Sequence, residues 1–351
     1  MKIKSVFKEY SLEFVDSIEY LINEDNNIFF VIDKKIYTLY VDIFKLLKHD
    51  RYLLIEALEK NKNMETVLLI CEKIMQLNSK RNTTLISIGG GIIQDITGFV
   101  ANVLYRGIKW IYIPTTLLAM CDSCIGGKSS LNYKEYKNII GSFYPPDRII
   151  MYLEFLNTLS LEDYYSGLGE IVKFNIIAGE NGINNIECNI NALIERDYNI
   201  LHEFIKNSLN FKKLYIEEDE FDQGKRIILN FAHTLGHAFE SSSLYQIPHG
   251  TAVVLGMITI NNISLQRNII NTCLTERIER ICKKIIPIKI DNKWLKINII
   301  MNAIKNDKKQ LSSSIRDILF DNNYNLTIHE DIKIEEISKA IEHLIKILYN
   351  C

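Results

Sequence analysis

Residues 85–95 have the sequence LISIGGGIIQD, and the architecture of the first half of the chain can be worked out from this segment. Leu85–Ile88 is an apolar run typical of a buried strand, and it leads into three consecutive glycines. An apolar pattern with helical spacing follows from Ile92 to Leu104. A strand that ends in glycines and continues as a helix presents backbone N–H groups at the positive helix end, which suits a phosphate. The glycines alone would also fit a tight turn.

A second glycine-containing segment with the same chemistry follows at Asp122–Lys128, DSCIGGK. Its two glycines are followed directly by Lys128, which adds a fixed cation to the backbone N–H groups. Two anion-binding turns this close in the chain predict a dinucleotide and a phosphorylated substrate bound side by side.

The first half alternates predicted strands with predicted helices, whereas the second half is dominated by helical spacing. The predicted strands are 28–32, 85–88 and 110–113, and the predicted helices are 65–77, 92–104, 161–177, 199–217, 233–243, 251–266 and 275–285. Alternating strands and helices predict an α/β layer with a mostly parallel sheet. We therefore predict an α/β dinucleotide-binding domain over residues 1–156 and an all-α domain over residues 157–351, with the site in the cleft between them. The asparagine-rich segment 181–191 is interpreted as a surface loop.

The composition narrows the class of protein. The 351 residues are 47% hydrophobic, which can fill two ordinary cores, and 41 basic residues face 43 acidic ones. This balance argues against a nucleic-acid or membrane-surface binder, which needs a basic excess. We find no signal peptide, no run of eighteen apolar residues and an odd number of scattered cysteines, seven in all. A cytoplasmic enzyme is the expectation.

Two histidines four residues apart, His233 and His237, predict imidazoles on one face of a helix. A catalytic divalent metal such as zinc needs three protein ligands and one open position. From the residues alone both histidines are candidate ligands, and the third ligand is unknown.

The order of these motifs resembles the sugar-phosphate cyclase family, and within it the 3-dehydroquinate synthases. The family patterns GGG-x-x-x-D, R-G, P-T-T-L-L-A, D-S-x-x-G-G-K and K-N-x-I-G-x-F-Y match residues 89–95, 106–107, 114–119, 122–128 and 137–144. The patterns G-L-x-E-x-x-K, L-N-x-x-H-T-x-G-H and H-G-x-A-V match residues 167–173, 229–237 and 249–253. The resemblance covers roughly residues 33–257, and it implies that the helical domain binds a metal ion.

The resemblance also implies a role for individual residues. The metal ligands would be Glu170, His233 and His249, with Zn²⁺ or Co²⁺ as the ion, while His237 would face the substrate phosphate. The catalytic residues implied in this way are Asp122, Lys128, Lys173, Lys212, Arg226, Asn230 and His237. Asn138 would bind substrate, and Arg106 would reach it from a second subunit of a homodimer. The NAD site implied by the resemblance comprises Asp33, Glu59, Lys62, Gly90, Gly91, Asp95, Thr115, Thr116, Asp122 and Lys137. Asp307-Lys308-Lys309 would supply one further phosphate lysine, either Lys308 or Lys309.

The implied activity is that of an NAD- and divalent-metal-dependent carbon–oxygen lyase acting on a phosphorylated sugar acid. The substrate would be 3-deoxy-D-arabino-heptulosonate 7-phosphate and the products 3-dehydroquinate and phosphate, on the route to aromatic amino acids. Transient oxidation by NAD⁺ acidifies a C–H, phosphate leaves by β-elimination, the ketone is reduced back, and an intramolecular aldol reaction closes the ring. The substrate phosphate can itself act as the base for the elimination.

Several positions depart from the family pattern, among them Ala232 in place of glycine and Thr251 in place of glutamate. Both neighbour implied metal ligands, so the sequence also fits a paralogous cyclase that acts on another heptulose or hexose phosphate. Lys212, Arg226 and Asn230 favour a substrate that carries a carboxylate. Two further candidate functions are those of a metal-dependent polyol dehydrogenase and of a non-catalytic binding protein with the same fold.

Overall fold

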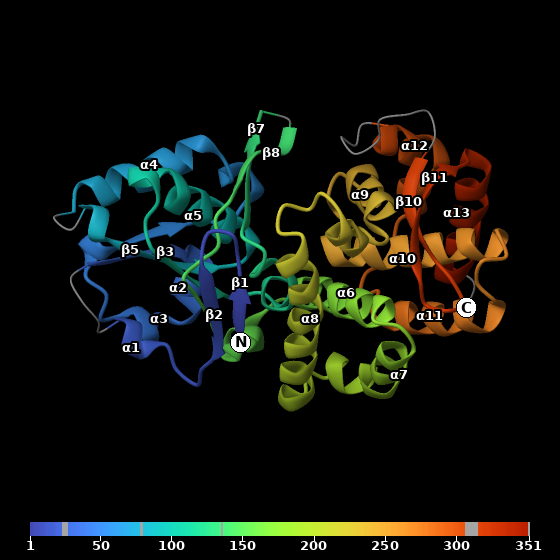
Figure 1. The fold of residues 1–351 in the computed structure, drawn as a ribbon, viewed down its shortest axis with the longest axis horizontal. Coiled ribbons are helices and arrows are strands. Elements are labelled where there is room, and N and C mark those ends of the chain that lie inside the picture. The colour runs from blue at the N-terminus through green and yellow to red at the C-terminus, as the bar shows by residue number, and fades with distance from the viewer. Residues whose placement is uncertain (23–26, 78–79, 135, 306–314, 350–351) are drawn as a thin grey trace. The chain divides into compact units, whose positions relative to one another are not determined.

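The structure, a computed structural model, describes residues 1–22, 27–77, 80–134, 136–305 and 315–349 (Figure 1). The chain divides into two compact units. The first comprises Met1–Leu159 and Lys213–Phe221, and the second comprises Ser160–Lys212 and Asp222–Cys351. The prediction assigned all residues from 157 onward to the second domain, whereas Lys213–Phe221 belongs to the first unit.

The first unit is built on a seven-stranded sheet in the order β1-β2-β9-β6-β5-β3-β4. All neighbouring strands pair in parallel except β1 and β2, which are antiparallel. The strands are β1 (Lys2–Lys4), β2 (Glu9–Phe14), β3 (Ile28–Asp33), β4 (Tyr52–Ile55), β5 (Thr84–Gly89), β6 (Trp110–Pro114) and β9 (Arg148–Met151). The three predicted strands are thus β3, β5 and β6, and their apolar runs are buried because helices cover the sheet.

Short helices and a long hairpin complete this unit. In Figure 1, α4 and α5 lie above the sheet, and α1 and α3 lie below it. The helices are α1 (Glu19–Ile22), α2 (Lys34–Leu39), α3 (Val41–Phe44), α4 (Met64–Met75) and α5 (Gly91–Val103), with a π-helix at Ala119–Ser123. The 3₁₀ helices of the unit are His49–Arg51, Glu59–Asn61, Lys80–Asn82, Leu104–Arg106 and Leu153–Thr158. The antiparallel hairpin β7 (Lys128–Tyr133) and β8 (Tyr136–Phe143) packs on α5 and was not predicted.

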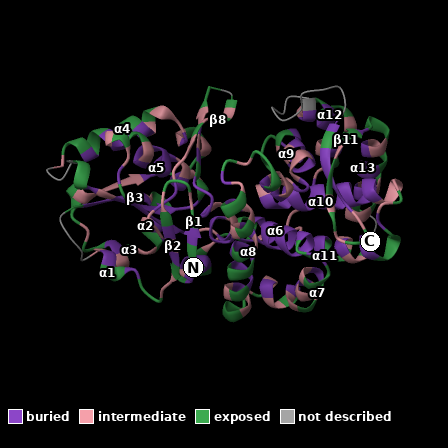
Figure 2. Ribbon diagram, viewed as in Figure 1, coloured by how far each residue is buried: buried purple, intermediate pink, exposed green. Residues whose placement is uncertain are grey.

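The second unit is largely helical, and α10 is its central element. Figure 2 shows α10 buried along most of its length, and every residue from Gly250 to Ser264 is buried. Helices α6, α9, α11 and α13 pack around it. The helices are α6 (Leu161–Ile177), α7 (Glu180–Ile194), α8 (Tyr198–Glu218), α9 (His233–Ser242), α10 (His249–Gln266), α11 (Thr272–Lys284), α12 (Ile297–Lys305) and α13 (Ile334–Tyr349), with 3₁₀ helices at Lys225–Asn230 and Asn292–Leu295. The end of α8, from Lys213 onward, belongs to the first unit.

The predicted fold class is confirmed with one correction: the second unit is not entirely α-helical. It contains the antiparallel hairpin β10 (Ile315–Phe320) and β11 (Leu326–Ile332). Four of the six residues from Ile315 to Phe320 are apolar and β10 is almost wholly buried, so it packs as a core strand against α10. None of the helices in the described part of the chain combines the length and apolar character that a membrane span requires.

One local prediction was wrong. The asparagine-rich segment 181–191 is not a loop but forms most of α7, which buries Ile183, Ile186, Ile190 and Leu193. This i, i+3, i+7, i+10 spacing places the four side chains on one helix face, and their burial outweighs the modest helix propensity of asparagine. Helix α10 begins at His249, two residues before the predicted start at residue 251, and Pro248 occupies its N-cap position.

We expect Leu244→Gly to stabilise the protein by about 1 kcal/mol. The end of α9 is a Schellman motif in which Tyr245 N–H donates to Glu240 O at 2.8 Å and Leu244 N–H to Ser241 O at 3.0 Å. Leu244 takes the left-handed position with φ 55°, where glycine is normally found, and its side chain is 79% exposed. Glycine removes the backbone strain and sacrifices little burial. Urea unfolding measures the gain, and Leu244→Ala is the control that keeps the strain. Equal stability of the two variants would contradict the prediction.

The contacts of Arg267, at the end of α10, lead us to expect that the protein loses stability in acid. It donates from Nε to Glu336 Oε1 at 2.6 Å and from Nη2 to Glu336 Oε2 at 2.8 Å, which ties α10 to α13. This hydrogen bonding holds the pKa of Glu336 below its ordinary value of 4.5.

Because the unfolded carboxyl binds protons at a higher pH than the folded one, the stabilisation is complete above pH 4.5 and is lost as the pH falls through the lowered pKa. Glu336→Gln should therefore lose less stability than the wild type when urea unfolding is compared at pH 6 and at about pH 3. Glu335 is an exposed neighbour, and Glu335→Gln should lose as much stability as the wild type between pH 6 and about pH 3. An equal loss of stability over the same pH range in wild type and Glu336→Gln would show that the contact between Glu336 and Arg267 is not its cause.

Candidate active site

Three side chains from three helices of the second unit converge on one point. Glu170 Oε1 lies 3.4 Å from His233 Nε2 and 3.4 Å from His249 Nε2. The ligand atoms of the three residues all lie within 4.8 Å of one another. Neither oxygen of Glu170 makes a well-directed hydrogen bond within the described residues, although the carboxyl is fully buried. One buried carboxylate and two imidazoles form a donor set that fits a catalytic zinc or cobalt ion with an open position.

A buried cation lies beside this cluster. Lys173 Nζ is 2.5 Å from Glu170 Oε2, one helical turn further along α6, and the two side chains are 2% and 0% exposed. Burial by itself raises the pKa of the Glu170 carboxyl, but Lys173 and the two imidazoles outweigh it and hold that pKa well below its usual range. The carboxylate is therefore ionised and ready to bind a metal ion at neutral pH.

The two imidazoles of the cluster differ in pKa. Burial, reinforced by the charge of Lys173, lowers the pKa of His233 to about 4, so that its ring is neutral. Burial also disfavours the charged form of His249, but the carboxylates of Glu170 and Glu240, 3.4 Å and 3.2 Å from its two ring nitrogens, raise its pKa to about 10. His233 Nδ1 lies 3.0 Å from Phe231 O, which leaves Nε2 to face Glu170.

The close approach of α6 and α10 places Glu170 next to His249. Gly250 N–H donates to Ser166 Oγ at 2.9 Å, and a Cβ on Gly250 would lie 1.7 Å from Ser166 O. A Cβ on Gly169 would lie 2.3 Å from Gly250 O. Glycine is therefore required at both positions, because the backbones of α6 and α10 are in contact next to Glu170 and His249.

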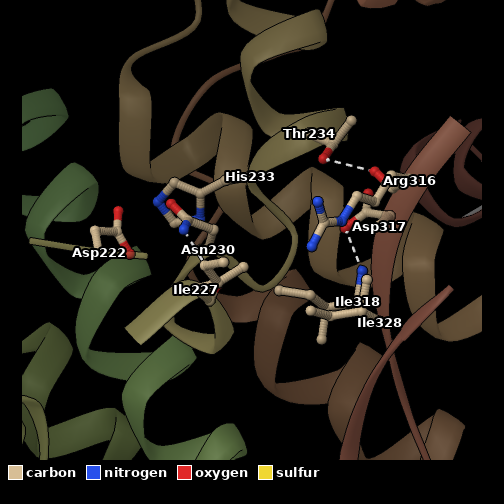
Figure 3. A pocket seen from close by; sticks show the side chains of 9 residues that line it. All are labelled: Asp222, Ile227, Asn230, His233, Thr234, Arg316, Asp317, Ile318 and Ile328. Atoms are coloured by element: carbon tan, nitrogen blue, oxygen red, sulfur yellow. Dashed lines mark hydrogen bonds between the residues drawn. The ribbon is translucent and has the colours of Figure 1, made fainter. Parts of the chain in front are cut away.

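A cavity of about 260 Å³ opens beside His233 (Figure 3). Asn230 lies next to His233 on one side, and the hairpin β10–β11 forms the opposite wall. Thr234 Oγ1 donates to Arg316 O at 3.3 Å and links α9 to that wall. The lining residues are Asp222, Ile227, Asn230, His233, Thr234, Arg316, Asp317, Ile318 and Ile328.

Of the other catalytic residues predicted for this unit, His237 and Asn230 lie beside residues of the cluster. The His237 ring centroid is 5.6 Å from that of His233 and 5.9 Å from that of His249. Lys212, Arg226 and Asn230 come from α8 and the 3₁₀ helix Lys225–Asn230, and the two cationic side chains are buried, at 7% and 4% exposure. Asn230 Nδ2 donates to Ile227 O at 3.1 Å. Asp307, Lys308 and Lys309 lie outside the described residues.

The residues predicted to bind NAD gather in the first unit, several of them at the carboxyl ends of its parallel strands. Asp33 ends β3 and caps α2 by accepting from Lys35 N–H at 2.9 Å. Gly90 is the N-cap of α5, directly after β5. Thr115 and Thr116 directly follow β6, and a Cβ on Gly90 would lie 2.9 Å from Thr116 Cγ2. In open parallel sheets this edge is where nucleotides bind.

Five further predicted residues of this unit form two contacting groups. Lys62 Nζ lies 2.5 Å from Asp95 Oδ2 and donates to Asn138 Oδ1 at 2.7 Å. Glu59 Oε1 lies 4.0 Å from Lys137 Nζ. The β7–β8 hairpin is connected to the same group, since Ser130 donates from N and Oγ to Asp95. Glu59 and Lys62 are thus held against α5 and the hairpin.

Three more predicted residues belong to this unit. Asp122 lies on the π-helix Ala119–Ser123, an irregularity often found at functional sites. Lys128 is exposed at the start of β7, with Nζ 5.9 Å from the centroid of Phe143. Arg106 is exposed in a sharp turn in which Tyr105, Arg106 and Gly107 all have positive φ.

Comparison with known proteins identifies the family. Residues 52–166 match the 3-dehydroquinate synthase N-terminal family model, and residues 167–310 match the C-terminal one. The chain is 39% identical over 333 residues to a 3-dehydroquinate synthase from Clostridium tetani, covering 93% of this chain and 88% of that protein. The chain belongs to the 3-dehydroquinate synthase family. The resemblance inferred from the motifs is confirmed.

Two solved structures share the fold of this chain. A 2-deoxy-scyllo-inosose synthase complexed with carbaglucose-6-phosphate, NAD⁺ and Co²⁺ gives a TM-score of 0.85 at 23% identity and covers 98% of this chain and 99% of that one. A 2-epi-5-epi-valiolone synthase from Streptomyces hygroscopicus subsp. jinggangensis 5008, with NAD⁺ and Zn²⁺ bound, gives a TM-score of 0.84 at 21% identity and covers 96% and 97% of the two chains.

The structure adds residues that the sequence analysis of this family member missed. Glu240 Oε2 lies 3.2 Å from His249 Nδ1, on the side of the ring away from Glu170. The signal was present, because Glu240 follows His233 and His237 at i+7 and i+3 and so shares their helix face. The walls of the cavity supplied by β10 and β11 had no such signal, since they come from a hairpin that was not predicted.

Proposed function

We propose that this chain is a carbon–oxygen lyase that converts 3-deoxy-D-arabino-heptulosonate 7-phosphate into 3-dehydroquinate and phosphate. The observation that carries the proposal is the cluster of Glu170, His233 and His249 beside the buried Lys173, in a chain of this family. The buried Lys212 and Arg226 favour a substrate with a carboxylate over a neutral sugar phosphate.

NAD and a zinc or cobalt ion are the cofactors of this proposal, since related structures are described with NAD⁺ and Zn²⁺ or Co²⁺. When bound, NAD⁺ accepts and returns a hydride, and the metal ion polarises the alcohol that is oxidised. Glu170, His233 and His249 would hold the metal ion. The NAD-binding residues would be Asp33, Glu59, Lys62, Gly90, Gly91, Asp95, Thr115, Thr116, Asp122 and Lys137.

The protein's own contribution is positioning and electrostatics. Arg226 would hold the substrate carboxylate with two parallel N–H groups, with Lys212 as a second cation. Asp122, Lys173 and Lys212 would orient the ring hydroxyls. Lys128, Asn138, Asn230 and His237 would hold the phosphate, which takes the proton removed during β-elimination. A separate side-chain base is then unnecessary for this step.

We also propose that the enzyme acts as a homodimer in which Arg106 serves the site of the partner subunit. The observation that supports this is the turn at Tyr105–Gly107, where three successive residues with positive φ present an exposed arginine. Backbone strain of this kind is commonly retained at functional positions.

The test is phosphate release from the purified, metal-loaded protein with this substrate and catalytic NAD⁺, while absorbance at the NADH band is followed. Stoichiometric phosphate without net NADH is the expected result. Release only from a neutral heptulose or hexose phosphate would move the protein to a paralogous cyclase. Steady accumulation of NADH would identify a dehydrogenase and overturn the proposal.

A further inference from the structure

The imidazole of His249 has carboxylates at both of its nitrogens. Nε2 lies 3.4 Å from Glu170 Oε1, within the cluster assigned to the metal ion. Nδ1 lies 3.2 Å from Glu240 Oε2, whose side chain is 17% exposed. His249 is the first residue of α10, and Glu240 lies in the last turn of α9. Their contact therefore joins the two helices at the cluster.

The second contact determines which nitrogen of His249 can bind a metal ion. A neutral imidazole carries its proton on one nitrogen and has its lone pair on the other. A carboxylate at Nδ1 accepts a hydrogen bond from that nitrogen, and this leaves the lone pair on Nε2, directed at Glu170. Carboxylate–histidine–metal arrangements of this kind fix the tautomer and the ring orientation and increase the basicity of the ligand.

We infer that Glu240 is a positioning residue of the metal centre, which holds His249 with Nε2 as the ligand atom. The inference rests on the metal site of the proposed function and extends it to a residue that neither the motifs nor the comparisons assign. His233 is oriented in the corresponding way by a backbone group, since its Nδ1 lies 3.0 Å from Phe231 O. His249 instead depends on a side chain, and that side chain can be changed.

A competing explanation uses the same atoms. His237, Glu240 and His249 also have ligand atoms within 4.8 Å of one another, which could hold a second metal ion. His249 would then have to bind metal through both nitrogens, which requires loss of the N–H proton that a neutral imidazole retains. A positioning role needs no such deprotonation. The two explanations differ in the number of metal ions bound.

The experiment measures zinc binding to the metal-free protein by competition with a chromophoric chelator, together with the visible spectrum of the Co²⁺-loaded form. Wild type should bind one equivalent. Glu240→Ala should weaken binding about 10–100-fold and alter the Co²⁺ spectrum. Glu240→Gln keeps a hydrogen-bond acceptor but loses the charge, so its zinc affinity should lie between those of wild type and Glu240→Ala. The midpoint of thermal unfolding of each metal-free variant separates this effect from a general loss of structure.

Glu279→Gln is the matched control, because Glu279 Oε1 makes a hydrogen bond of 2.6 Å with His343 Nε2 on α11 and α13, and neither residue belongs to the cluster. It should leave zinc affinity unchanged. Unchanged affinity in Glu240→Ala, or two equivalents of zinc in wild type, would overturn the inference. Wild type that binds no zinc or cobalt would contradict the proposed function itself, so the two failures are distinguishable.

Discussion

Replacing Glu170 with glutamine should abolish zinc binding and lower kcat about a thousandfold, since Lewis-acid stabilisation is worth several kcal/mol. The amide is neutral and nearly the same size, so the change removes the anionic ligand while it preserves packing. His233 and His249 remain, but two imidazoles without the carboxylate are an incomplete donor set. Zinc content after dialysis and the rate of phosphate release measure the two effects.

The same variant should lose about 3–5 kcal/mol of stability, because Lys173 would keep a buried charge without its anionic partner. Lys173 Nζ lies 2.5 Å from Glu170 Oε2, and its side chain is 2% exposed. The double variant Glu170→Gln/Lys173→Met removes both charges and should recover most of that stability in urea unfolding, without recovering zinc. Zinc retained by the single variant, or no recovery in the double variant, would contradict this account.

The elements that the sequence predicted well are those whose burial follows one simple period. Leu85–Ile88 and Trp110–Ile113 are fully buried parallel strands, so their apolar runs are continuous. Helix α6 was predicted with its observed ends. Segment 181–191 was misinterpreted because its composition was weighed above the helical spacing of Ile183, Ile186 and Ile190, which continues to Leu193. The hairpin β7–β8 escaped prediction because its outer strand is exposed and has no sustained alternation.

Only part of the candidate site could be predicted from the residues alone. The spacing of His233 and His237 correctly placed both imidazoles on one face of α9, but spacing cannot tell which other helix that face meets. Glu170 and His249 are separated from His233 by 63 and 16 positions in the sequence, and they reach it through the packing of α6 and α10. The family motifs supplied that pairing. Glu240 was missed because it matches no motif that was used.

Gly250→Ala should have the other large effect, a loss of about 3 kcal/mol of stability or more together with about a hundredfold loss of kcat/KM. A Cβ at this position would lie 1.7 Å from Ser166 O and 2.6 Å from Ser166 C, and both are backbone atoms that no rotamer change can move. Helices α6 and α10 would therefore have to separate. Glu170 and His249 lie on these two helices, so their separation lengthens the distance that a metal ion must bridge.

Gly182→Ala in α7 is the matched control, because its Cβ would lie 2.1 Å from Asn175 O but the helix carries no predicted ligand. Both variants should unfold at lower urea concentration than wild type. Only Gly250→Ala should also weaken zinc binding when chelator competition is measured at a temperature where both proteins remain folded. Equal zinc affinity in the two variants would mean that the contact between Gly250 and Ser166 contributes to folding alone. A weaker affinity confined to Gly250→Ala would show that this glycine sets the spacing of the metal ligands.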